Sequence, residues 1–87
     1  MRRMDNEFLY GNIKKVDLHG YSREEALSLM LHEVFIADNT IDGIEFIHGY
    51  HGGRVLKDLV RKEFSSDRVE KIVCIDASRT IYKIKKQ

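Results

Sequence analysis

The chain has 87 residues, 43% hydrophobic and 33% charged, which suits one small core and is too apolar for an ordinary disordered segment. No apolar run approaches the roughly 20 residues that span a bilayer, and none follows the charged N-terminus as in a signal peptide. The single Cys74 excludes an intramolecular disulfide framework. We therefore expect a cytoplasmic single-domain protein. The net charge of +1 is unevenly spread, because residues 1–40 sum to −2 and residues 41–87 to +3, which permits a local basic surface without establishing one.

The chain begins with a polar stretch, so residues 1–10 are expected to be a flexible N-terminal segment and residues 11–87 the folded domain. The segment from Ile13 to Leu18 predicts a strand, in which Val16 and Leu18 share one face and Asp17 lies on the other.

The first helix has a clear start signal. Ser22 is followed three residues later by Glu25, which is the spacing of a capping box, so the helix is expected from about Arg23 to Ala37. Leu29 and Ile36 form a second apolar line, which indicates either deep packing or a surface for homodimerisation. The main apolar stripe at helical spacing comprises Leu27, Met30, Leu31, Val34 and Ala37.

The second half repeats the pattern and then adds a strand. It predicts a strand at 44–47, a helix at 54–64, a strand at 72–75 and a strand at 80–85. Because the run 72–75 is continuously apolar, we expect that strand to be buried on both faces, with Cys74 in the core. In the last strand Tyr82 is expected to lie in the core with its hydroxyl at the surface, and Lys83 and Lys85 to protect a sheet edge.

The order of elements is strand, helix, strand, helix, strand, strand. Two strand–helix–strand units imply parallel strands, and the short final connection implies an antiparallel hairpin. The predicted fold class is therefore α/β: a two-layer β-α-β-α-β-β sandwich with a mixed, mostly parallel four-stranded sheet and two helices.

Two loops share an apolar–His–Gly–Tyr pattern. Leu18-His19-Gly20-Tyr21 and Ile47-His48-Gly49-Tyr50 stand 29 residues apart, about the length of one strand–helix–strand unit. Each follows a strand and precedes a helix, and ligands bind at this edge of open α/β sheets. A single His–Gly after a strand is usually an ordinary turn, but two of them at equivalent positions favour a shared site.

The chemistry around these loops suits an anion, and a phosphodiester backbone is the obvious candidate. Glycines let a ligand approach the backbone, Arg54 and Lys57 supply positive charge, and the two tyrosines can stack on bases. The residues expected to bind nucleic acid are Gly20, Tyr21, Gly49, Tyr50, His51, Gly52, Gly53, Arg54 and Lys57.

These motifs make the sequence similar to the Smr (small MutS-related) domain, in its stand-alone form, over about residues 13–85. Asp17-Leu18-His19-Gly20, followed by a helix that contains Glu25-Ala26, matches the first motif of that family. Ile47-His48-Gly49-Tyr50, the glycine cluster and Leu56-Lys57 match the second, His-Gly-x-Gly with a following Leu-Arg. The sequence departs from the second motif, with His51 in a glycine position and Lys57 in place of arginine.

The resemblance implies a fold like that of the C-terminal domain of translation initiation factor 3. It also implies binding of DNA or RNA, with endonuclease (nicking) activity in some members. For phosphodiester hydrolysis we assign His19 and His48 as the acid/base pair and Asp17 as the residue that orients an imidazole. A divalent metal, Mg or Mn, held by Asp17 and a histidine would suit this chemistry, although no metal ligand set is predicted.

Two alternatives remain open on the sequence. The domain could bind nucleic acid or a ribonucleoprotein surface without cleaving, or it could be a protein-interaction domain that forms a homodimer through the second apolar line of the first helix.

Overall fold

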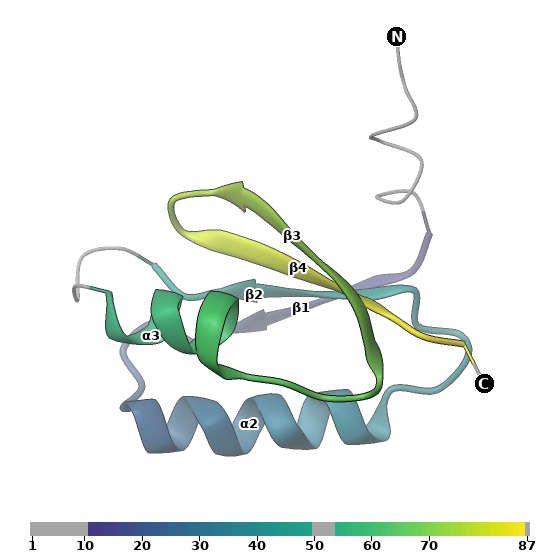
Figure 1. Ribbon diagram of the computed structural model, residues 1–87, viewed down its shortest axis with the longest axis horizontal. Coiled ribbons are helices and arrows are strands. Elements are labelled where there is room, and N and C mark those ends of the chain that lie inside the picture. Colours follow the sequence, from purple (N-terminus) through teal and green to yellow (C-terminus); the bar gives the residue numbers. More distant parts are fainter. Residues whose placement is uncertain (1–10, 50–53, 87) are drawn as a thin grey trace, which may run out of the picture.

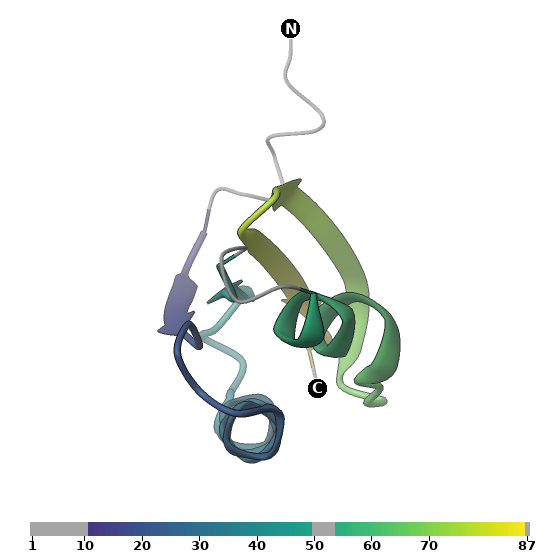
Figure 2. The same ribbon diagram turned by 90° about the vertical axis from the view of Figure 1, so that its left-hand side faces the viewer.

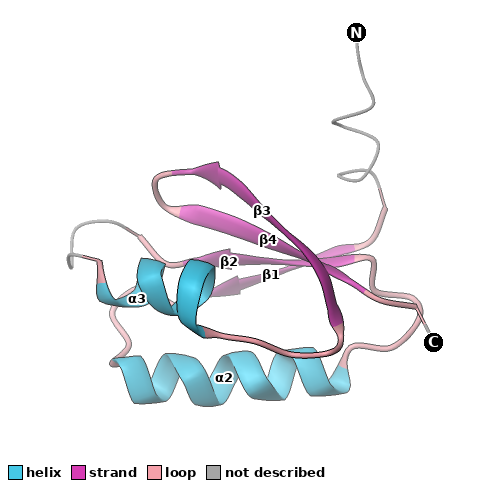
Figure 3. Ribbon diagram, in the orientation of Figure 1, coloured by secondary structure: helices cyan, strands magenta, loops and turns pink. Residues whose placement is uncertain are grey.

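The computed structural model describes residues 11–49 and 54–86, and their elements follow the predicted order (Figures 1 and 3). The predicted N-terminal segment, residues 1–10, lies outside the described residues. The elements in chain order are β1 (Ile13–Asp17), α2 (Arg23–Ile36), β2 (Gly43–Ile47), α3 (Val55–Asp58), η1 (Leu59–Glu63), β3 (Val69–Asp76) and β4 (Arg79–Ile84).

The four described strands form one mixed sheet in the order β1-β2-β4-β3. β1 and β2 pair in parallel, whereas β4 runs antiparallel to both of its neighbours, β2 and β3. The predicted mixed sheet and final hairpin are therefore confirmed, and three of these strands share one direction. Because β4 is inserted between β2 and β3, however, one of the three pairings among the described strands is parallel and two are antiparallel.

The helices cover one face of the sheet, so the domain has two layers (Figure 2). Its core lies between the layers and is centred on Tyr82, whose ring packs edge-on against Phe46 at 5.0 Å and stacks with Phe64 at 5.7 Å. The Tyr82 hydroxyl donates a hydrogen bond to the buried carbonyl of Val60, and burial raises the pKa of this phenol. The expectation of a hydroxyl at the surface was thus wrong, because the second helix covers it.

Helix α2 starts as its sequence predicts. The Ser22 hydroxyl accepts from the Glu25 N–H, and the Glu25 carboxylate accepts from the Ser22 N–H, which completes the capping box. The buried side is Ala26, Met30 and Val34. No helix in the described part of the chain is long and apolar enough to cross a membrane.

The opposite side of α2 keeps apolar groups in solvent. Leu29 packs partly against the core, whereas Leu31, Phe35 and Ile36 are exposed, and Phe35 is 80% exposed. The predicted placement of Leu31 in the buried stripe was therefore wrong. Homodimerisation through the second apolar line, Leu29 and Ile36, stays a prediction.

β3 is an edge strand rather than a fully buried one. Cys74 is exposed and Ile72 is 37% exposed, so the predicted burial of both faces and the core position of Cys74 were wrong. The reason is the insertion of β4, which takes the central place and buries Thr80 and Ile81 as well as Tyr82. Lys83 and Lys85 were expected to protect a sheet edge, and this was wrong because β4 is an inner strand.

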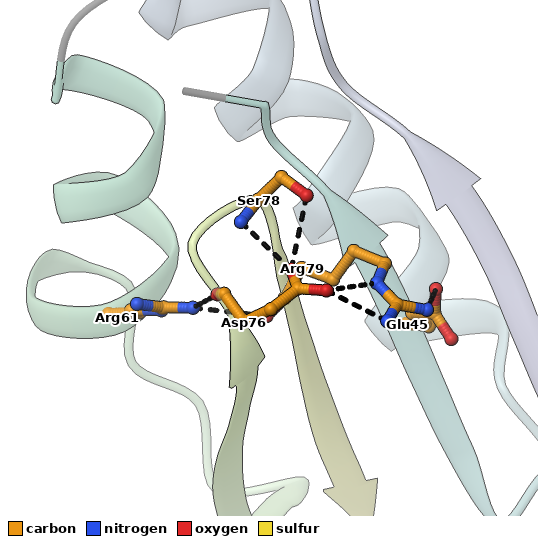
Figure 4. A network of polar contacts seen from close by, with 5 residues as sticks. All are labelled: Glu45, Arg61, Asp76, Ser78 and Arg79. Carbon is orange, nitrogen blue, oxygen red and sulfur yellow. Dashed lines mark hydrogen bonds and ion pairs between the residues drawn. The ribbon is translucent and has the colours of Figure 1, made fainter.

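The second helix occupies the predicted span, but its winding changes midway. Its α-helical part, α3, is followed by the π-helical part, η1, where the Phe64 N–H donates to the Leu59 carbonyl at 2.8 Å, an i→i+5 bond. Single π-turns of this kind are frequent near functional sites. This turn carries Arg61, and it faces the hairpin between β3 and β4 (Figure 4).

Candidate functional site

The two His–Gly loops lie side by side at one edge of the sheet. Asp17 pairs with Ile47 at the ends of the parallel strands β1 and β2, and the Leu18 N–H donates to the Ile47 carbonyl at 2.8 Å. A Cβ added to Gly49 would stand 3.4 Å from the Cβ of His19, so the two loops are close neighbours. The pairing confirms that both loops leave the same edge.

His19 is held by Asp17 and is open to solvent. One carboxylate oxygen, Asp17 Oδ1, accepts the His19 N–H at 3.0 Å and lies 2.6 Å from His19 Nδ1. The side-chain hydrogen bond from His19 is the main reason that the pKa of Asp17 is lowered. A carboxylate can only accept, so Nδ1 carries the proton. The His19 side chain is 71% exposed, which leaves Nε2 available to a ligand.

His48 has the same sequence context but the opposite environment. It is 4% exposed, and its Nδ1 and Nε2 lie 3.0 Å from the Gly49 carbonyl and from Thr80 Oγ1. Burial lowers the pKa of His48, and the charges of Arg61 and Lys57 act in the same direction. The imidazole is therefore neutral near pH 7, and both of its nitrogens are engaged inside the protein.

A third loop, the β3–β4 hairpin, completes the edge. The Ser78 carbonyl accepts the N–H groups of His48 at 2.9 Å and Gly49 at 3.1 Å. Asp76 fixes the hairpin by accepting from the Ser78 N–H at 2.9 Å and from Arg79 at 2.8 and 2.9 Å. The Arg79 guanidinium beside Asp76 holds the pKa of that carboxyl well below its usual range. Figure 4 shows this network with its labelled residues.

The hairpin was predicted from the sequence but not as part of the site, although the Asp-Ala-Ser-Arg segment at 76–79 carried a signal. Aspartate two residues before serine is typical of an Asx-turn, in which the carboxylate bonds the backbone two residues on.

Arg61 ties the second helix to this hairpin. Its Nε donates to Thr80 Oγ1 at 2.7 Å, and its Nη2 donates to the carbonyls of Arg79, at 3.0 Å, and Asp76. A planar guanidinium is suited to such divergent acceptors, which a lysine would not satisfy together. Nε and Nη2 are thus directed at the protein rather than at a ligand.

Comparison with known proteins identifies the fold. No protein-family model and no curated protein matches the chain. Among solved structures, the crystal structure of the Smr domain of Thermus thermophilus MutS2 matches with a TM-score of 0.66 and 21% identity, over 83% of this chain and 98% of that chain. This chain has the Smr-domain fold.

On this Smr fold, the residues expected to bind nucleic acid lie around the two loops where they are described. Gly20 and Gly49 have positive φ values of 87° and 73°, a conformation that glycine adopts without strain. Tyr21 and Arg54 are exposed, and Lys57 lies close enough to His48 to lower its pKa. Tyr50, His51, Gly52 and Gly53 fall outside the described residues.

The described residues do not make a metal site. No group of three or more histidine, cysteine, aspartate or glutamate side chains gathers anywhere in 11–49 or 54–86. Asp17 and His19 alone supply one open carboxylate oxygen and one ring nitrogen, and Asp17 Oδ1 is already bound to His19. A divalent cation held by these two residues would need water and substrate oxygens to complete its coordination.

Proposed function

We propose that this domain binds the phosphodiester backbone of nucleic acid at the edge formed by the two His–Gly loops, and that His19 cleaves it there. The observation that carries the proposal is the exposed imidazole of His19, whose Nδ1 is held 2.6 Å from Asp17 while Nε2 is open. An imidazole oriented in this way is suited to acid–base chemistry at neutral pH.

The chemistry needs one imidazole in two successive states. Neutral Nε2 of His19 takes a proton from a water molecule, whose oxygen forms a bond to phosphorus. The bond from phosphorus to the leaving oxygen then breaks, and the imidazolium returns the proton to that oxygen. Asp17 remains ionised, keeps Nδ1 protonated and stabilises the imidazolium, as a carboxylate does beside a catalytic histidine.

Positive charge for the phosphate comes from Arg54 and Lys57, which make no ion pair with other described residues. The exposed ring of Tyr21, which immediately follows Gly20, is placed to stack on an unpaired base. In this proposal His48 is not the second acid/base group, because its two nitrogens already bond Gly49 and Thr80.

The test is cleavage of supercoiled plasmid and of a structured RNA by the intact chain and by H19A. General acid–base groups contribute about 10²- to 10⁴-fold, so H19A should lose at least about a hundredfold in rate. D17N should also be impaired, because it removes the charge that stabilises the imidazolium. The matched control is H32A, which removes an exposed histidine of α2 and should cleave normally.

Unchanged cleavage by H19A would exclude the assigned role. Salt-sensitive binding without cleavage under any divalent cation would instead favour a non-catalytic binding module. If neither nucleic acid binds, the proposal fails as a whole.

A further inference from the structure

A continuous chain of hydrogen bonds runs from the second helix to the His48–Gly49 loop. It begins at Arg61 Nε, which lies 2.7 Å from Thr80 Oγ1. It continues through Thr80 Oγ1 to His48 Nε2 at 3.0 Å, and from His48 Nδ1 to the Gly49 carbonyl at 3.0 Å. Gly49 in turn lies beside His19, since a Cβ added to it would stand 3.4 Å from the Cβ of His19. A helix, a strand and a loop are thereby linked in series.

The protons in this chain can be arranged in one way. A guanidinium has no acceptor, so Thr80 Oγ1 accepts from Arg61. A carbonyl has no donor, so His48 Nδ1 donates to Gly49. Neutral His48 then has an acceptor at Nε2, and the remaining hydrogen of Thr80 is directed there. The Gly49 carbonyl therefore sets the Nδ1–H tautomer of His48, and Arg61 supports it because it occupies one of the two acceptor positions of Thr80 Oγ1.

Burial makes any other arrangement costly. Thr80 is 0% exposed and His48 is 4% exposed, so a donor left without an acceptor here would have no water to bond. Loss of Arg61 would leave both acceptor positions of Thr80 Oγ1 free, so that His48 Nε2 could donate there in the other tautomer. The π-turn of η1 carries Arg61 at the hairpin, where it also bonds the carbonyls of Asp76 and Arg79.

We propose that Arg61 is a positioning residue for the His19 site, which acts through Thr80 to hold His48 in its Nδ1–H tautomer and thereby to keep Gly49 against His19. The tautomer rests on the hydrogen bonds, and the proximity of Gly49 to His19 rests on the backbone geometry. The consequence for activity rests on the proposed function.

The first test reads the tautomer of His48 by long-range ¹H–¹⁵N NMR of the imidazoles in the intact chain. The Nδ1–H form is the reverse of the form that a free histidine prefers in water, so the expected spectrum is distinctive. R61A and T80V should both shift His48 toward a mixture of tautomers. T80S, which keeps the hydroxyl, should restore the Nδ1–H form. R68A is the matched control, because Arg68 also bonds backbone carbonyls, those of Val34 and Phe35, but in another part of the domain.

The second test follows the contact between the loops and the activity together. The cross-relaxation signal between Gly49 Hα and His19 Hβ should weaken in R61A and T80V but not in R68A. Cleavage of the same plasmid should fall by up to about a hundredfold in R61A, since small misplacements of reacting groups cost that much. The fall should appear in kcat rather than KM.

Retention of the Nδ1–H tautomer in both R61A and T80V would overturn the proposal, as would an equal loss of activity in R68A. If the intact chain neither binds nor cleaves nucleic acid, the proposed function fails. If the tautomer of His48 still responds to R61A and T80V as expected, the effect of Arg61 on His48 stands without its consequence for catalysis.

Discussion

His19 and His48 show how two residues with the same neighbours in sequence acquire different chemistry. Each follows a strand and precedes glycine, yet His19 is 71% exposed beside a carboxylate and His48 is 4% exposed beside a hydroxyl and a carbonyl. β1 is an edge strand, so its loop faces solvent, whereas β2 lies between β1 and β4, so its loop is covered by the hairpin. Position in the sheet, not local sequence, decides which imidazole is available.

The buried state of His48 predicts a dependence of stability on pH. In an unfolded chain histidine has a pKa of about 6.5, and burial lowers the pKa of His48 in the folded protein. Between these values the unfolded chain binds more protons, so the free energy of unfolding falls as the pH drops from about 7 toward the folded pKa. The stability that neutral, buried His48 contributes is fully present above the pKa of the unfolded chain.

Urea unfolding at a series of pH values from 8 to 5 measures this effect. H48Q, which cannot titrate, should show a smaller loss of stability on acidification than the unaltered chain. H32Q, at an exposed position on α2, should keep the original slope. An unaltered slope in H48Q would show that His48 is not the residue responsible.

Among the elements, the two His–Gly loops make a matched pair. Both glycines have positive φ, which costs a residue with a Cβ roughly 1–2 kcal/mol. Around Gly20 no atom lies within 4 Å of an added Cβ, whereas around Gly49 the Cβ of His19 stands at 3.4 Å. The loops therefore differ in what a methyl group would touch, not in backbone strain.

We predict that G20A and G49A lower the free energy of unfolding by similar amounts, but that G49A alone changes the surroundings of His19, because its methyl group would touch that side chain. Stability is measured by urea unfolding, and the position of His19 by its imidazole chemical shifts and by cleavage rate. Equal effects of the two substitutions on His19 would contradict the contact between the loops.

The elements themselves were predictable wherever the determinants are local. The capping box of Ser22 and Glu25 gave the start of α2 correctly, and the Asp17–His19 contact joins residues two apart. The edge position of β3 was not predictable, because an apolar run such as Ile72–Ile75 looks the same in a central strand and in an edge strand. Arg61 and Thr80 meet across 19 positions of sequence through tertiary packing, so no spacing indicated their link to His48.

For the whole molecule, the distribution of charge matters more than the net value of +1. The C-terminal basic residue Lys86 pairs with Asp42 at 2.7 Å, just before β2 begins. The two His–Gly loops instead follow the ends of β1 and β2. The basic tail and the candidate site thus lie at opposite ends of the sheet. Arg61 and Arg79 are bound to the protein, which leaves Arg54 and Lys57 as the described cations at the site without an ion pair.

This arrangement predicts a shallow salt dependence of nucleic-acid binding. Two phosphate contacts correspond to a slope of about −1 to −2 in a plot of log K against log salt concentration. K57A should reduce the slope by about one, whereas K86A should leave it unaltered. Fluorescence anisotropy of a labelled oligonucleotide in a salt series gives both values. A slope several times steeper would place most of the binding charge elsewhere on the molecule.

The central position of β4 also determines when this domain can fold during its synthesis. Arg79–Ile84 is the last of the described strands in chain order, so it leaves the ribosome after both helices and the other three described strands. Until then β2 and β3 have no partner between them, and the apolar side of the helices has no complete sheet to cover it. Folding of the nascent chain must therefore wait for the hairpin to close, and the unpaired edges of β2 and β3 are open to chaperones or to aggregation during that interval.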